Sequence, residues 1–171
     1  LKSLSGNGAI LLHPGWNFVS VPRPLALGSD TASIFAGVSS GGHSILTYNY
    51  SDGWKSLKAT DLLPIMTGYW IYSTKEDSVT LKYQLNPVPV KKEVIAGWNT
   101  YGIPGMDAAA AKDALSPVKG VWKYVVGYDA TLQQYETPIL NDGSGDQDDD
   151  RLLQPTRGYW LYSAGAGSIT G

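Results

Sequence analysis

The chain repeats two short motifs, and this internal duplication constrains its fold more than any other feature. Residues 15–22 (GWNFVSVP) recur as 97–104 (GWNTYGIP), and residues 68–73 (GYWIYS) recur as 158–163 (GYWLYS). The first pair is offset by 82 positions and the second by 90, which indicates a tandem duplication with insertions in the second copy. A duplicated unit of short strands without a recurring polar constellation favours building or binding over catalysis.

The duplication predicts a mainly β protein with one short helix per repeat, built as two similar small β-barrel or sandwich modules in tandem. Copy one spans residues 1–85 and begins with an N-terminal arm, 1–9. Copy two spans residues 94–171 and carries an Asp-rich insertion. Residues 86–93 include two prolines, and we expect them to form an extended linker that the prolines stiffen.

Each helix is expected after an aspartate that can cap it. Asp30 precedes residues 31–38, and Asp107 precedes the alanine-rich residues 108–115, where helix propensity is high. Alternating residues and turn-forming glycines predict the strands. The strands expected in copy one are 16–21, 45–50, a strand that opens at Trp54, 68–73 and 79–85.

The composition argues against two classes of partner. Charged residues make up 16% of the chain, against roughly 25% in a typical soluble domain, and the net charge is −2. Because Lys and Arg do not cluster, the chain lacks the basic surface that nucleic acid requires. No apolar run approaches the roughly 20 residues of a membrane helix. We expect no nucleic-acid partner and no membrane insertion.

The aromatic residues are mostly Tyr and Trp. Eleven Tyr and six Trp stand beside two Phe, and such amphipathic rings suit half-buried strand faces and wet interfaces. Residues repeated within a duplicated motif are typical of core packing or a subunit interface, and a platform that stacks on sugar rings is the alternative. The tryptophans at equivalent places in the two copies are Trp16, Trp70, Trp98 and Trp160.

Copy two ends with a shorter segment than copy one. Copy one closes with 78–85 (SVTLKYQL), whereas copy two stops after 168–171 (SITG), and the first residues of the chain (LKSL) resemble the missing part. A sheet that lacks a strand exposes unpaired backbone groups and invites another strand to pair. We therefore expect strand donation, in trans as a head-to-tail interface or in cis as a closed monomer, with a cut from a longer array as the alternative. The expected interface residues are Leu1, Lys2, Ser3, Leu4, Ser168, Ile169 and Thr170.

Five aspartates lie within nine residues of the glycine-rich insertion in copy two. Calcium takes six to eight oxygen ligands, which closely spaced Asp residues and backbone carbonyls supply. The spacing does not fit an EF-hand, and a solvated acidic loop is the alternative interpretation. The sequence predicts a calcium site with Asp142, Asp146, Asp148 and Asp150 as ligands, beside Asp149.

Two further features bear on modification and catalysis. Asn49 begins an Asn-Tyr-Ser triplet, which is an acceptor for N-glycosylation in a secreted protein. The only histidines, His13 and His43, have no second ligand or nucleophile at a recognisable spacing, and no catalytic motif is present. We therefore predict that the chain is not an enzyme. A deep pocket that combines one of these histidines with a carboxylate would favour an enzyme instead.

The two motifs together resemble a module that is repeated in secreted and cell-envelope proteins of archaea, notably methanogens. In copy one the motifs are GWN at 15–17 and Leu63 followed by GYWIY at 68–72; in copy two they are GWN at 97–99 and Leu153 followed by GYWLY at 158–162. The resemblance implies an extracellular structural or adhesive role in a surface layer, sheath or filament. It carries no catalytic residues to transfer.

These observations predict a structural subunit of an extracellular cell-surface assembly whose main partner is a further copy of itself. Tyr and Trp side chains are expected to pack between the units. The alternative is a carbohydrate-binding or adhesion module of a larger secreted protein, with glycans as partners.

Overall fold

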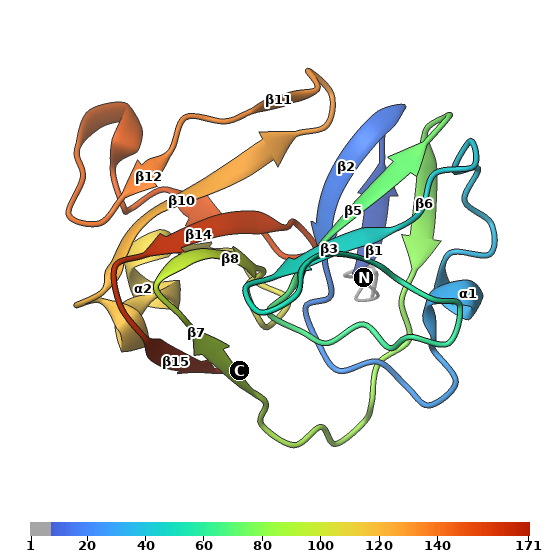
Figure 1. Cartoon of the computed structure of the whole chain (residues 1–171), viewed down its shortest axis with the longest axis horizontal. Coiled ribbons are helices and arrows are strands. Elements are labelled where there is room, and N and C mark those ends of the chain that lie inside the picture. Colours follow the sequence, from blue (N-terminus) through green and yellow to red (C-terminus); the bar gives the residue numbers. More distant parts are fainter. Residues whose placement is uncertain (1–7) are drawn as a thin grey trace, which may run out of the picture.

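The computed structural model describes residues 8–171. The chain is mainly β, with 40% of residues in strands and 9% in helices, which confirms the expected class. Within the described residues the strands form two larger sheets and three two-stranded ribbons, and they do not close into a barrel (Figure 1). No helix in this part of the chain is long and apolar enough to cross a membrane.

Copy one forms a four-stranded sheet in the order β2-β5-β3-β4 and a separate ribbon of β1 with β6 (Figure 1). Its elements are β1 (Ala9–Leu12), β2 (Gly15–Ser20), α1 (Thr31–Ile34), β3 (Leu46–Asn49), β4 (Gly53–Ser56), β5 (Gly68–Ser73) and β6 (Asp77–Thr80).

Copy two forms a five-stranded sheet in the order β11-β10-β14-β8, with β12 also on β10, and the ribbons β13-β9 and β15-β7. Its strands are β7 (Lys91–Val94), β8 (Gly97–Tyr101), β9 (Ala109–Ala110), β10 (Trp122–Asp129), β11 (Gln134–Tyr135), β12 (Ile139–Leu140), β13 (Leu152–Leu153), β14 (Tyr159–Ser163) and β15 (Gly167–Thr170). Its helices are α2 (Ala111–Ala114) and the 3-10 turns η1 (Ser116–Val118) and η2 (Gly145–Gln147).

The repeated motifs pair in the same register in both copies. β2 is antiparallel to β5 with Trp16 opposite Tyr72, and β8 is antiparallel to β14 with Trp98 opposite Tyr162. The rings of these pairs meet edge to face, with centroids 5.4 Å and 5.2 Å apart. The same residue types at the same places therefore build the same local structure.

The asparagine of each GWN motif locks the corner that precedes its strand. The Oδ1 of Asn17 accepts the backbone N–H of His13 at 2.8 Å, and its Nδ2 donates to the carbonyl of His13 at 2.8 Å. Asn99 makes the same two bonds with Ile95, at 3.1 and 2.9 Å. The motif glycine lies within the corner at a positive φ (103° for Gly15), which favours glycine. GWN is therefore a structural signature of the turn.

The tyrosine of each GYW motif ties its strand to the loop before it. The hydroxyl of Tyr69 donates to the carbonyl of Pro64 at 2.8 Å, and the hydroxyl of Tyr159 accepts the backbone N–H of Gln154 at 2.7 Å. Both rings are buried, and this burial raises the pKa of both hydroxyls. Each copy thus anchors its central strand from within the core.

The glycine of each GYW motif makes room for Phe18. A Cβ at Gly68 would lie 2.5 Å from the Phe18 ring, and a Cβ at Gly158 would lie 2.7 Å from it. The backbone N–H of Gly158 also donates to the carbonyl of Phe18 at 2.9 Å, and Ser20 donates to Thr156 at 2.8 Å. These contacts join β2 of copy one to the segment that leads into β14 of copy two.

The first helix begins as expected, but the second does not. Asp30 caps α1 by accepting the backbone N–H of Ser33 at 2.8 Å, although the helix ends at residue 34 rather than 38. Asp107 does not cap α2, because residues 109 and 110 instead pair with Leu152–Leu153 of β13. Pairing with a distant segment overrides the helix propensity of alanine there.

The last strand of copy two does not lack a partner. β15, which includes Ser168, Ile169 and Thr170, pairs along its whole length with β7, as β6 pairs with β1 in copy one. The premise of an unfilled sheet is therefore wrong, because residues 91–93, expected as linker, belong to the strand that fills it. The fifth strand of copy one also ends at residue 80 rather than 85. The expected donor residues Leu1, Lys2, Ser3 and Leu4 lie outside the described residues.

Gln133 fastens the tip of the β10–β11 hairpin to the edge of β2. Its Oε1 accepts the backbone N–H of Trp16 at 2.8 Å, and its Nε2 donates to the carbonyl of Trp16 at 2.8 Å. The side-chain amide thus replaces a β-strand partner for one residue. No corresponding bonds join Trp98 to the hairpin of copy one among the described residues.

We predict that Gln133→Ala lowers the free energy of unfolding by about 1–2 kcal/mol, because two hydrogen bonds between the copies are lost. Denaturant unfolding measures the change. Gln134→Ala is the matched control, since this neighbouring side chain is equally exposed but makes no hydrogen bond among residues 8–171. An equal effect of the two substitutions would contradict the assignment of Gln133 as a latch.

Candidate functional site

Each copy inserts the tryptophan of its GYW motif among the aromatic residues of the other copy. Trp70 of copy one lies with its ring centroid 4.8 Å from Tyr128 and 6.2 Å from Tyr135 of copy two. Trp160 of copy two lies 5.5 Å from Tyr48 and 5.7 Å from Trp54 of copy one. The contacts are edge to face and reciprocal, so the two sheets meet through an aromatic layer. The expectation that Tyr and Trp pack between the two units agrees with these contacts.

The larger aromatic cavity lies between the two sheets and has a volume of about 650 Å³. This volume lies within the usual range for small-molecule sites. Trp54 remains 57% exposed and Trp98 38% exposed, so indole rings are open to solvent at this site. The lining residues are Tyr48, Trp54, Trp98, Tyr124, Val126, Tyr135, Glu136, Pro138 and Trp160.

The smaller aromatic cavity has a volume of about 290 Å³ and repeats the larger one with the copies exchanged. Trp16 takes the place of Trp98, and Trp70 takes the place of Trp160, as the strand registers require. Trp54 lines both cavities, and so does Tyr135, which is 56% exposed. The lining residues are Trp16, Leu46, Trp54, Trp70, Tyr128 and Tyr135.

Among its lining residues the larger aromatic cavity carries one charged side chain, Glu136, whose charge is compensated. Its Oε1 lies 2.6 Å from Nη2 of Arg157, which also donates to the carbonyl of Tyr128 at 2.8 Å. Both partners of this ion pair are about one-third exposed or less. The cavity therefore combines aromatic surfaces with hydroxyl and indole N–H groups and has no uncompensated charge.

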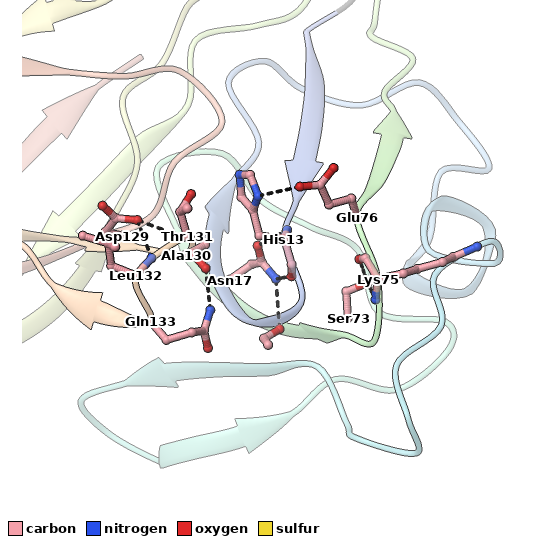
Figure 2. Close-up of polar contacts among 11 residues, drawn as sticks. His13, Asn17, Ser73, Lys75, Glu76, Asp129, Ala130, Thr131, Leu132 and Gln133 are labelled. Atoms are coloured by element: carbon pink, nitrogen blue, oxygen red, sulfur yellow. Dashed lines mark hydrogen bonds and ion pairs between the residues drawn. The ribbon is translucent and has the colours of Figure 1, made fainter.

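A polar cavity of about 390 Å³ lies beside the aromatic layer and is lined by His13, Asp129 and Glu136, among others. His13 pairs with Glu76 (Figure 2), and its Nδ1 is 3.7 Å from Oε1 of the carboxylate. A pocket that combines a histidine with a carboxylate would favour an enzyme, and His13 with Glu76 meets this condition in part. The pair is exposed to solvent, which weakens it, and no hydroxyl nucleophile is hydrogen-bonded to the imidazole among the described residues.

His43 belongs to the aromatic packing of copy one. Its ring centroid lies 4.3 Å from that of Tyr72 and 5.2 Å from that of Trp16. The structure therefore places the two histidines at different sites.

The aspartates of the insertion form several separate contacts. Asp142 Oδ1 is 3.7 Å from Nζ of Lys119, and Asp150 pairs with Lys112 of α2. Within residues 8–171 no three acidic or histidine side chains come together as metal ligands. The calcium site stays a prediction.

The other groups of the insertion hold its backbone in place. Asp148 accepts the backbone N–H of residue 150 at 2.8 Å, and Asp149 accepts that of residue 142 at 2.9 Å. Arg151 Nη1 donates to the carbonyls of Asp146 and Thr137, each at 2.8 Å. The Arg151 guanidinium thus bridges these two carbonyl oxygens by hydrogen bonds.

Asn49 is exposed at the end of β3, next to the β3–β4 turn. Its Nδ2 donates to Asp52 Oδ2 at 2.9 Å, and its Oδ1 accepts from the hydroxyl of Ser51 at 2.8 Å. These bonds give it a structural role in the turn. Glycosylation at this accessible amide stays a prediction.

Lys92 on β7 is half-buried and lies opposite Ile169 of β15. The equivalent residue of copy one, Ile10, is fully buried. Burial lowers the pKa of Lys92 from 10.5 to about 8. A nearby cavity of about 270 Å³ is lined by Tyr48, Asn49, Tyr50, Ser51, Lys92, Glu93, Ile95, Asn99 and Thr100.

Sequence reasoning identified four tryptophans of this site and missed the residues that complete it. Two of the missed residues, Tyr48 and Tyr128, have a sequence signal: residues 46–48 and 126–128 correspond at a third offset, 80, which follows from their pairing with β5 and β14. The missed residues are Tyr48, Trp54, Tyr124, Tyr128 and Tyr135.

The chain matches no known family model, and no curated protein or solved structure is significantly similar to it. Its function is therefore inferred from the geometry of the two aromatic cavities.

We predict that Lys92→Ile stabilises the protein by about 2 kcal/mol at pH 7, because the folded state no longer buries a charge. The unfolded state binds more protons than the folded state between pH 8 and pH 10.5, so the native protein gains stability as the pH rises through this window. The advantage of the variant therefore shrinks from pH 7 to pH 10. Denaturant unfolding at both pH values measures it.

Lys91→Ile is the control for this prediction, since Lys91 is exposed on the same strand and pairs with Glu93 at the surface. It is expected to change stability by less than about 1 kcal/mol. A Lys92→Ile variant whose advantage stays constant with pH would contradict the buried charge.

Proposed function

We propose that the chain is a non-catalytic glycan-binding module of an extracellular protein, and that it takes neutral pyranose rings in the larger aromatic cavity. The observation that carries this proposal is a cavity of about 650 Å³ with solvent-open tryptophans and no uncompensated charge. In this proposal the two copies are equivalent modules, and each contributes residues to the lining of the larger aromatic cavity.

The chemistry of a pyranose fits these walls. Its ring has an apolar face of C–H groups that packs on an aromatic face, and its hydroxyls can pair with the hydroxyl and N–H groups that Tyr and Trp side chains carry. A cavity formed only by Leu or Phe would offer the apolar contact without these polar partners. The amphipathic lining supports a ligand that is itself amphipathic.

The charge balance supports a neutral ligand over a cationic one. Aromatic cages also bind quaternary ammonium groups, for which a free carboxylate adds attraction. Glu136 is already paired with Arg157, so that attraction is compensated inside the protein. A choline-like ligand is therefore an alternative outcome of the test.

The location at a cell surface stays part of the proposal. It draws on the resemblance of the GWN and GYW motifs to modules of archaeal envelope proteins. Glycans are abundant at such surfaces, and a binding module without catalytic machinery would serve adhesion there.

A tryptophan substitution tests the proposal. A glycan array of neutral oligosaccharides, probed with the whole chain, is expected to give binders, and calorimetry then measures their affinity. Trp98→Ala is expected to weaken binding at least tenfold, about 1.4 kcal/mol, because it removes one wall of the cavity. Tyr50→Ala is the matched control, since Tyr50 is an exposed aromatic residue that does not line this cavity.

Failure to bind any neutral glycan, or equal affinity of Trp98→Ala and the unaltered chain, would overturn the proposal. Binding of choline in place of sugars would change the ligand class to a quaternary ammonium. Thermal melts of both variants establish that they are folded.

A second candidate function, a subunit of a surface assembly, is favoured by exposed apolar side chains in copy one and the segment that follows it. Leu27, Leu62, Leu85 and Val88 are strongly exposed, and Leu27 and Leu62 line a cleft of about 270 Å³. Exposed apolar groups of this kind often mark an interface, and a further copy of the chain is the occupant proposed.

Sedimentation velocity across a concentration series tests the second candidate. We predict self-association of the whole chain that is lost in the double variant Leu27→Ser, Leu85→Ser. A chain that remains monomeric at every concentration, or a double variant that associates as before, would contradict it.

A further inference from the structure

We infer that the smaller aromatic cavity is a second sugar subsite, and that the natural ligand is an oligosaccharide chain that spans both cavities. This inference rests on the proposed function and extends it from a single sugar-binding cavity to a groove with two subsites.

The two cavities are the same construction made twice. Trp16 and Trp98 hold the same place in the GWN motif, and Trp70 and Trp160 hold the same place in the GYW motif. Tyr128 of the smaller cavity corresponds to Tyr48 of the larger one. A chemistry that suits one cavity therefore suits the other.

The cavities adjoin each other through two shared walls. Trp54 on β4 and Tyr135 on β11 line both, and they come from different copies. Both side chains are more than half exposed, at 57% and 56%, so the junction is open to solvent. A ligand in one cavity can therefore continue past these residues into the next without crossing a buried partition.

Trp70 lines the smaller cavity with its ring, because its indole nitrogen is enclosed by protein. The residue is 7% exposed, and its indole Nε1–H has no acceptor among the described residues. An unpaired buried donor costs about 1–3 kcal/mol. The smaller cavity therefore offers the ring of Trp70 for stacking rather than a hydrogen-bond donor.

The subsites differ in size, so they are expected to differ in affinity. The smaller cavity has less than half the volume of the larger one, about 290 against 650 Å³. Gln133 fixes Trp16 of the smaller cavity by two backbone hydrogen bonds. A short sugar should therefore occupy the larger cavity, and only a longer chain should reach the smaller one.

Isothermal titration calorimetry with two neutral series, cello-oligosaccharides and N-acetylchito-oligosaccharides of two to six units, tests the inference. For a series that binds, the affinity is expected to rise at least tenfold from two to six units. Trp16→Ala should remove this gain and leave the affinity for two units unchanged. Trp98→Ala should weaken binding of both lengths.

Leu46→Phe provides a second variant, because it fills the smaller cavity rather than emptying it and does not depend on the fold tolerating the loss of Trp16. It is expected to lose the chain-length gain in the same way. Tyr50→Ala is the control and should retain the gain.

The outcomes separate the inference from the proposed function. The second subsite is overturned if affinity does not depend on chain length, if Trp16→Ala and Leu46→Phe leave affinity unchanged, and if Trp98→Ala weakens it. The larger cavity would then be the single sugar-binding site. Absence of binding by both series and by every glycan of the array overturns the proposed function together with the inference.

Discussion

The exchange of tryptophans between the copies is the interaction on which the rest of the structure depends. Trp70 is held by Tyr128 and Tyr135 of copy two, and Trp160 is held by Tyr48 and Trp54 of copy one. Each such aromatic pair contributes about 0.5–1.5 kcal/mol beyond the area that it buries. Because neither copy can complete this packing alone, the two sheets are fixed against each other. The cavities lie where the aromatic layer does not close.

Local sequence predicted the elements whose signals are local. Alternation gave strand β5 at its observed bounds, and the side chain of Asp30 caps α1 as expected. The failures concern pairing between distant segments: residues 109 and 110 join β13 instead of starting a helix, and residues 91–93 join β15 instead of forming a linker. Residues 91–94 (KKEV) and 9–12 (AILL) share no identical residue at the first offset, so only the strand pairing reveals that both segments hold the same place.

The candidate site was only half visible in the sequence for a similar reason. The motifs reveal the repeated tryptophans, which are compatible with core packing and with a sugar platform. Equivalent motif positions proved unequal in exposure: Trp70 is almost buried, whereas Trp160 is half-buried. The cause lies on the neighbouring strand, where Phe18 stacks on Trp70 with centroids 4.4 Å apart and Thr100 stands opposite Trp160. Motif identity alone cannot report this difference.

The same two local differences account for the unequal cavities. On one side Phe18 backs Trp70 and Gln133 draws the β10–β11 hairpin onto Trp16, so that the walls of the smaller cavity are held close. On the other side Thr100 provides less bulk behind Trp160, and the larger cavity remains. Because Trp54 and Tyr135 line both cavities, a substitution at either residue acts on both cavities at once. The same holds for Phe18, whose ring also lies 5.6 Å from that of Trp160, whereas a change at Gln133 acts on the smaller cavity alone. Two sheets built on the same motifs can therefore border unequal cavities without disturbing the packing that they share.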